Sequence, residues 1–290
     1  MEIQWPLVIF TLCVCLAAGI FALQGLLCVL GKGEKTQKSA VITTLVALVV
    51  GGAASFMHLE HWDRVFNGFG HLSSGITQEL IGIVVMVVVL IIFFLVGRKG
   101  LAPKWAGILA MLVSIAVVAL LTTSYMMPAR PVWSTPLLYL FYFAQAFVGG
   151  AAVLWILSAL TKDEQSTPLM IKCTAIGGVI VLISLLAYGA LAGTMQFAQF
   201  GSAFDTTNPT VLPPDPSALT GQLFTGSLAL PFWLAVVFGG LIPAALGIFK
   251  WKGEQSALPM AAICIICALA GGLAFRAVLY MLGFTVVAIF

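Results

Sequence analysis

Long apolar runs alternate along the chain with short polar segments. Each run is mostly apolar over roughly the 20 residues that a helix needs to cross the hydrocarbon core of a bilayer. The runs cover residues 6–30, 40–57, 79–97, 105–121, 136–160, 168–192, 225–249 and 257–290. They do not alternate as β-barrel strands would, and backbone groups in lipid must bond within their own segment. The pattern predicts an all-α integral membrane protein, with eight transmembrane helices in a single domain over residues 1–290.

The composition agrees with a membrane location. Hydrophobic residues make up 61% of the chain and charged residues only 8%, whereas a soluble domain carries about 25% charged residues. The first run follows Met-Glu-Ile-Gln, which lacks the basic residues of a cleavable signal, so we expect it to stay as the first span. The net charge of +3 has no soluble face on which to form a basic stripe, and we expect no nucleic-acid partner.

Basic residues collect in every second connection between the predicted spans. The first, third, fifth and seventh connections, with the residues beside them, hold Lys32, Lys35, Lys38, Arg98, Lys99, Lys104, Lys162, Lys172, Lys250 and Lys252. The other connections hold only Arg64 and Arg130. Because positively charged connections stay in the cytoplasm, we predict that both termini lie on the outer side of a bacterial cytoplasmic membrane.

The connections predicted to lie outside are also the longer ones, at about 58–75, 125–135 and 193–223. The last contains Asn208-Pro209 and Pro213-Pro214, which favour a loop over a span. Long loops commonly carry function. We therefore expect a substrate or partner site on the outer face.

Ionisable residues lie at one predicted depth in three different spans. His58 ends the second span, Glu79 begins the third, and Arg276 lies in the outer half of the eighth. A guanidinium inside the bilayer costs at least about 2.5–3.5 kcal/mol unless it is paired or wetted. Tyr280 follows Arg276 by four residues and shares its helix face. Taken singly, His58 would be an ordinary interfacial histidine and Glu79 a carboxylate favoured by the helix dipole, but their shared depth favours a common site.

This set of residue types suits the oxidation of a quinol, which releases protons together with electrons. Glu79 and His58 are the candidate catalytic residues. A partly buried carboxylate would accept one proton, and the histidine would bond the other oxygen or take the second proton. Arg276 would orient the carboxylate or polarise a quinone oxygen.

Further residues complete the predicted quinol site. Arg64 or Asp63 would connect it to outer water, while Trp133 and Tyr280 would flank the ring. Aromatic residues at this depth also form interfacial belts, so Trp133 and Tyr280 have that second interpretation.

The histidines and cysteines predict no haem and no metal in this chain. His58, His61 and His71 crowd into one outer corner, where they do not suit axial ligation of haems stacked across the membrane. Cys264 and Cys267 form a C-x-x-C within an apolar stretch with no second pair to complete four ligands, which favours a packing role. Electrons from a quinol would therefore pass outward to a partner that holds cofactors.

Several segments resemble the anchor subunits of the dimethyl sulfoxide reductase family. They are Gln4–Thr11, Met57-His58-Leu59, Arg64–Asn67, Ser73–Glu79, Tyr125–Pro136 and Arg276–Tyr280. The resemblance implies oxidation of menaquinol, with a histidine and a glutamate at the positions of His58 and Glu79 implicated in quinol binding. It also implies two partners on the outer face, a molybdopterin catalytic subunit and a four-cluster iron–sulfur subunit.

Three functions are compatible with the residues themselves. A quinol-oxidising anchor confines functional residues to the outer third of the membrane. A proton-coupled secondary transporter would favour charges near the midplane, broken helices and internal repeats, and the sequence has no clear repeat. A purely structural membrane subunit would not require a histidine, a glutamate and an arginine at one level. The sequence favours the anchor.

Overall fold

The structure is a computed structural model that describes residues 3–57, 71–127, 130, 132–194, 218–252 and 257–282. In this part of the chain, eight helical spans are long and apolar enough to cross a membrane, which confirms the predicted all-helical fold class. The regular spans are α1 (Trp5–Val29), α2 (Glu34–Phe56), α3 (Gly75–Val96), α4 (Lys104–Tyr125), α5 (Pro136–Leu160), α6 (Thr167–Leu191) and α10 (Leu258–Leu282). The seventh span along the chain runs through α8 (Ala229–Leu234), η3 (Ala235–Leu241) and α9 (Ile242–Phe249), and the short helices η2 (Ala192–Thr194) and α7 (Ala218–Phe224) precede it.

Several helices extend beyond the predicted spans. The helix α2 begins at Glu34 instead of residue 40, and α4 ends at Tyr125 instead of residue 121. Hydropathy marks only the stretch that crosses hydrocarbon, whereas a helix continues into the headgroup region, where polar side chains stay solvated. The helix α7 covers the end of the predicted connection 193–223 and continues to Phe224, so this part is helical, but its seven residues are too few to be a span.

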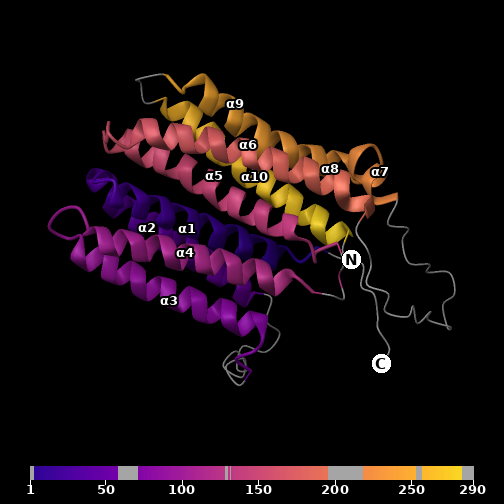
Figure 1. The fold of residues 1–290 in the computed structure, drawn as a ribbon, viewed down its shortest axis with the longest axis horizontal. Coiled ribbons are helices and arrows are strands. Elements are labelled where there is room, and N and C mark those ends of the chain that lie inside the picture. The colour runs from indigo at the N-terminus through magenta and orange to yellow at the C-terminus, as the bar shows by residue number, and fades with distance from the viewer. Residues whose placement is uncertain are drawn as a thin grey trace.

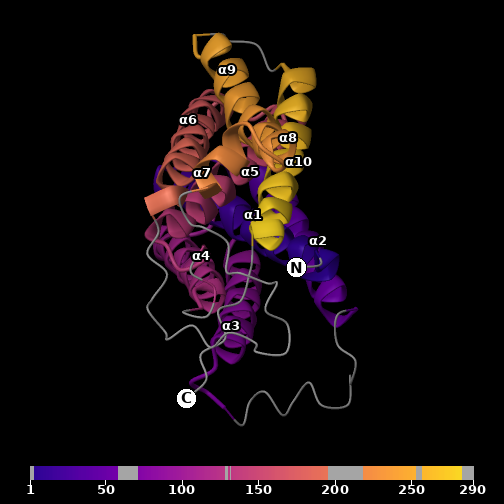
Figure 2. The same ribbon diagram turned by 90° about the vertical axis from the view of Figure 1, so that its right-hand side faces the viewer.

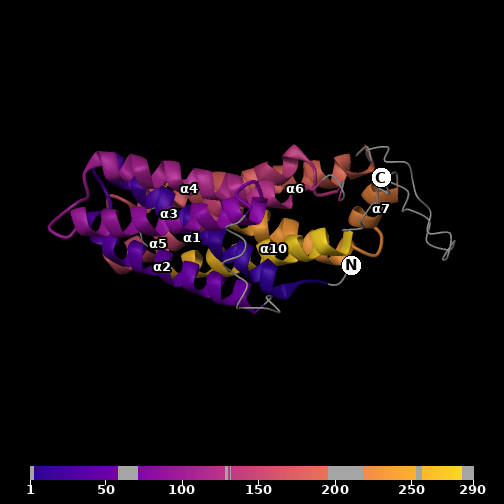
Figure 3. The ribbon, with the colours of Figure 1, turned by 90° about the horizontal axis from the view of Figure 1, so that it is seen from below.

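The spans form two groups that lie against each other along their length (Figure 1). The first group contains α1 to α4 and the second contains α5 to α10, and α1 packs against α2, α4 and α5. Seen along the bundle, α1 and α5 lie near the junction of the groups (Figure 2). The long helices run side by side, and α1 begins at the end of the bundle where α10 finishes (Figure 3).

Small residues let α1 and α5 approach closely at this junction. A Cβ added to Gly19 of α1 would overlap the carbonyl group of Ala146, and one added to Gly150 of α5 would overlap the backbone of Gly19. Lipid provides no hydrophobic force between helices, so close backbone packing of this kind is a main source of their association energy. The contact joins the two groups.

The seventh span departs from regular α-helical geometry. Its middle, Ala235–Leu241, is π-helical and lies just before Pro243, which has no N–H to donate to the preceding turn. Gly239 in this stretch lies directly against Gly271 of α10. The close contact holds α10 in the second group and fixes the depth of the residues that follow Gly271.

We expect Gly19→Ala to lower the free energy of unfolding by about 1–3 kcal/mol, because the added methyl group must push α1 away from α5. The matched control is Gly52→Ala in α2, where an added Cβ would have no neighbour within 4 Å. Removing a helix glycine there should leave stability unchanged or raise it by up to about 1 kcal/mol. Unfolding by dodecyl sulfate in mixed micelles measures both, and equal effects would contradict the close-contact account.

Candidate functional site

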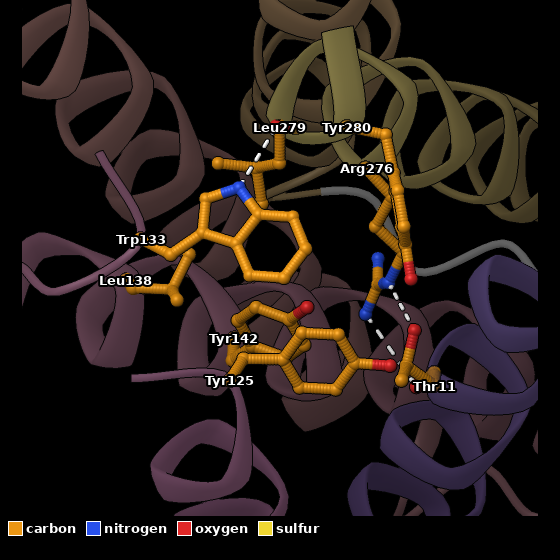
Figure 4. Close-up of a pocket in the computed structure, with 8 residues that line it drawn as sticks. All are labelled: Thr11, Tyr125, Trp133, Leu138, Tyr142, Arg276, Leu279 and Tyr280. Atoms are coloured by element: carbon orange, nitrogen blue, oxygen red, sulfur yellow. Dashed lines mark hydrogen bonds between the residues drawn. The ribbon is translucent and has the colours of Figure 1, made fainter. Parts of the chain in front are cut away.

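A small pocket lies where the two helix groups meet, towards the end of the bundle at which α1 begins (Figure 4). It is lined by Thr11, Tyr125, Trp133, Leu138, Tyr142, Arg276, Leu279 and Tyr280. The centre of a water molecule can occupy about 10 Å³ of the pocket, which is roughly the space that one buried water requires. A larger ligand would enter only if the surrounding side chains moved apart.

Arg276 is the charged residue of this pocket, and its side chain is fully buried. Nε donates to the hydroxyl of Thr11 at 2.9 Å, and Nη1 donates to the carbonyl of Gly272 at 3.1 Å. Nη2 donates to Oε1 of Gln145 at 3.1 Å and, at 3.5 Å each, to the carbonyl of Thr11 and to Sγ of Cys15. The guanidinium therefore ties α10 to α1 and α5, which lowers the cost of its burial.

Four aromatic residues line the pocket together with Arg276, and we call them the aromatic box. They are Tyr125, Trp133, Tyr142 and Tyr280. The guanidinium carbon lies 4.8 Å from the ring centre of Tyr142, a cation–π distance. Tyr125 stacks on Tyr142 with ring centres 6.3 Å apart, and Trp133 meets Tyr280 edge to face at 5.3 Å. The box gives the pocket flat apolar walls with phenol hydroxyls on three of its four members.

Trp133 is held rigidly within the box. Its indole Nε1 donates to the carbonyl of Leu279 at 2.8 Å, and the guanidinium of Arg130 lies 4.3 Å from its ring centre. The hydroxyl of Tyr188 donates to the carbonyl of the preceding residue, Val132, at 2.8 Å. Trp133 is only 2% exposed within the protein, so its ring is a pocket wall and not part of a lipid-facing belt.

Glu79 is buried beside the pocket, on the first turns of α3. Its Oε2 accepts a hydrogen bond from the hydroxyl of Ser124 at 3.0 Å. Its Oε1 is buried and has no hydrogen-bond partner among the described residues. Gly75 lets α3 approach α4 closely beside the hydrogen bond between Ser124 and Glu79, because a Cβ added at Gly75 would lie 3.1 Å from Cα of Ser124. The first turn of α3 and the last turn of α4 are thereby in close contact.

The structure brings some of the predicted site residues together. Arg276, Tyr280 and Trp133 line one pocket, and Glu79 lies within electrostatic range of Tyr125 and Tyr142 in the aromatic box. No hydrogen bond joins Arg276 to the Glu79 carboxylate among the residues that the structure describes. Each residue makes its hydrogen bonds elsewhere, because the guanidinium faces α1 and α5.

Three of the predicted residues, His58, Asp63 and Arg64, lie outside the described residues. Sequence reasoning missed Thr11, Tyr125, Tyr142 and Gln145. A signal for the last two existed, because Leu138, Tyr142 and Gln145 follow one another at the i, i+4, i+7 spacing of a single helix face. A tyrosine and a glutamine on one face of a buried apolar helix indicate a polar partner on the facing helix.

All six cysteines are free. Cys264 and Cys267 are buried in the apolar interior of α10. Within the part of the sequence that the structure describes, no group of three or more His, Cys, Asp or Glu side chains is arranged to hold a metal ion.

Eight apolar spans with a charged, aromatic pocket near one end define a polytopic membrane protein. The sequence matches the family model of the DMSO reductase anchor subunit (DmsC) over residues 1–282, and the protein belongs to this family. It is similar to the C subunit of the anaerobic dimethyl sulfoxide reductase of Escherichia coli (strain K12). The identity is 25% over 296 residues, which cover 98% of the present sequence and 96% of that protein. These matches confirm the resemblance found in the sequence.

We expect Trp133→Phe to lower the free energy of unfolding by about 1–3 kcal/mol, because it leaves the carbonyl of Leu279 buried without its donor. The control is Trp105→Phe in α4, whose ring is 54% exposed within the protein. That change should stay within about 0.5 kcal/mol of the parent. Chemical denaturation in detergent compares the two, and a Trp133 variant as stable as the control would refute this role.

Proposed function

We propose that this protein anchors a respiratory molybdoenzyme complex in the membrane, and that it binds and oxidises menaquinol. The observation that carries the proposal is the pocket itself, where Arg276 faces the aromatic box and Glu79 lies buried beside it. A quinone needs apolar surroundings for its ring and tail and a hydrogen-bonding group near each oxygen, which is the usual composition of a small-molecule site. Membership of the anchor family supports the same function.

The reaction divides between the residues as follows. Glu79 accepts a proton from one quinol hydroxyl through its oxygen Oε1, which has no partner among the described residues. His58 bonds the other oxygen or takes the second proton, and Arg64 or Asp63 passes protons to outer water. Oxidation of one quinol releases two protons and two electrons, and yields the quinone.

The remaining residues bind the ring. Trp133 and Tyr280 flank it on the side of α10, and Arg276 polarises a quinone oxygen instead of holding Glu79. Entry requires the aromatic box to open, because the closed pocket has room for about one water molecule.

The partners of this subunit are, on this proposal, an iron–sulfur subunit with four clusters and a molybdopterin catalytic subunit. They would bind at the end of the bundle that carries the pocket, so that electrons leave the quinol over a short distance. The quinol site would then lie near the outer face of the bacterial cytoplasmic membrane, with lipid and quinone as the other molecules in contact with the protein. We expect no haem and no metal in this subunit.

Glu79→Gln should slow menaquinol oxidation by about a hundredfold or more while the complex still assembles, because the amide cannot accept the proton. The control Glu34→Gln alters an exposed carboxylate at the opposite end of the bundle and should leave turnover unchanged. Turnover is measured with a reduced naphthoquinone in membranes, against subunit content in the same sample. Normal turnover in assembled Glu79→Gln complex would refute the assignment.

The proposed sidedness has its own test. Ser73→Cys and Lys99→Cys place an exposed thiol at opposite ends of the bundle, while five of the six native cysteines are buried. A membrane-impermeant maleimide should label the Ser73 variant in intact spheroplasts, and the Lys99 variant only after lysis. The reverse pattern would place the pocket on the cytoplasmic side.

A further inference from the structure

The guanidinium of Arg276 carries a positive charge that no carboxylate offsets among the residues that the structure describes. Its hydrogen-bond acceptors are a hydroxyl, an amide oxygen, a thiol and two carbonyls, all of them neutral. The ring faces of Tyr142 and Phe141 add cation–π contacts at 4.8 Å and 5.7 Å. These groups hold the guanidinium in place and leave its net charge intact.

Buried charges in proteins are normally paired with an opposite charge. Arg276 is fully buried, and it lines a pocket. Such a charge stabilises a negative atom that arrives with a ligand more than it stabilises a neutral one. The low dielectric constant of the surroundings strengthens this preference.

We propose that the pocket selects the anionic form of the quinone ring, and that Arg276 is the group that stabilises the negative oxygen. This inference rests on the proposed quinol oxidation and deepens it. It makes Arg276 a residue that favours a particular charge state of the ligand, a role different from orienting Glu79.

The charge balance of the reaction explains why stabilising the anionic ring would speed the reaction. Transfer of one proton to Glu79 breaks an O–H bond of the quinol, leaves a monoanion and neutralises the carboxylate. The second proton then passes to the second base of the proposed mechanism and both electrons pass to the iron–sulfur subunit, which leaves neutral quinone. The ring is negative only between these steps, so Arg276 stabilises the intermediate more than either the quinol or the quinone, which is the condition for catalysis.

The separate placement of the two charged residues fits this role. Glu79 is hydrogen-bonded to Ser124 of α4, whereas Arg276 is bonded to α1, α5 and its own helix. An ion pair between them would stabilise the carboxylate and make it a weaker base. The observed arrangement leaves Glu79 available as a base and Arg276 available as a fixed positive charge.

The test compares two naphthoquinones of similar shape that differ in charge. One carries a hydroxyl on the quinone ring and is an anion at neutral pH, and the other is the neutral parent. Equilibrium dialysis against the purified whole complex, at high ionic strength to screen surface charges, measures both dissociation constants without requiring turnover. The complex without substitutions should bind the anionic naphthoquinone about ten- to a hundredfold more tightly than the neutral one. This ratio corresponds to the free energy of a hydrogen bond to a charged group.

Arg276→Gln should abolish this preference, and Arg276→Lys, which keeps the charge, should retain most of it. If the complex without substitutions binds both compounds equally well, the inference is overturned even if no variant assembles. An unchanged preference for the anion in assembled Arg276→Gln complex also overturns it. In either case the proposed function survives if turnover still depends on Glu79. Failure to bind either naphthoquinone, with turnover independent of Glu79, would instead refute the proposed function.

Discussion

A guanidinium buried within a membrane bundle has to find every one of its hydrogen-bond acceptors inside the protein, because lipid offers none. Arg276 meets this requirement with groups from three helices: Thr11 of α1, Gln145 of α5 and Gly272 of its own helix α10. The bonds fix the depth and the rotation of these helices relative to one another. The aromatic box is built around the same point, since Tyr142 lies one turn from Gln145 and Tyr280 one turn from Arg276.

The close packing of the helices supports this arrangement. Gly19 and Gly150 let α1 and α5 approach closely, about two turns from Thr11 and about one and a half turns from Gln145 respectively. Gly271 lets α10 meet the π-helical stretch of the seventh span just before Arg276. Bulkier residues at these points would widen the helix spacing, and the acceptors would no longer reach the guanidinium. Glycine contacts and hydrogen bonds are therefore parts of one geometric requirement.

The sequence predicts the number and type of the spans because hydropathy over a bilayer thickness is a direct physical requirement. It also predicts the common depth of Glu79, Arg276 and Tyr280, since depth follows from position along alternating spans. It does not predict which residues meet. Uniformly apolar helices carry little information about their rotation, so the bonds of Arg276 to Thr11 and Gln145 could not be deduced.

The environment of single side chains was equally hard to predict. By residue type and position, Trp133 could also be an interfacial belt residue. In the structure it is a buried wall of the pocket, because its Nε1 donates to the carbonyl of Leu279 in α10. Contacts between segments distant in sequence decide whether such a side chain is buried, and the local sequence pattern does not predict these contacts.

The distance along the sequence between Thr11 and Arg276 has a consequence for biosynthesis. Helices enter the membrane in the order in which they leave the ribosome, and Arg276 of α10 is hydrogen-bonded to Thr11 of α1. Until α10 has been inserted, the other spans hold a set of neutral acceptors with no cation to bind. A nascent or truncated polypeptide without α10 would therefore lack the buried cation that lines the pocket, and the pocket would gain its positive charge only after α10 has been inserted.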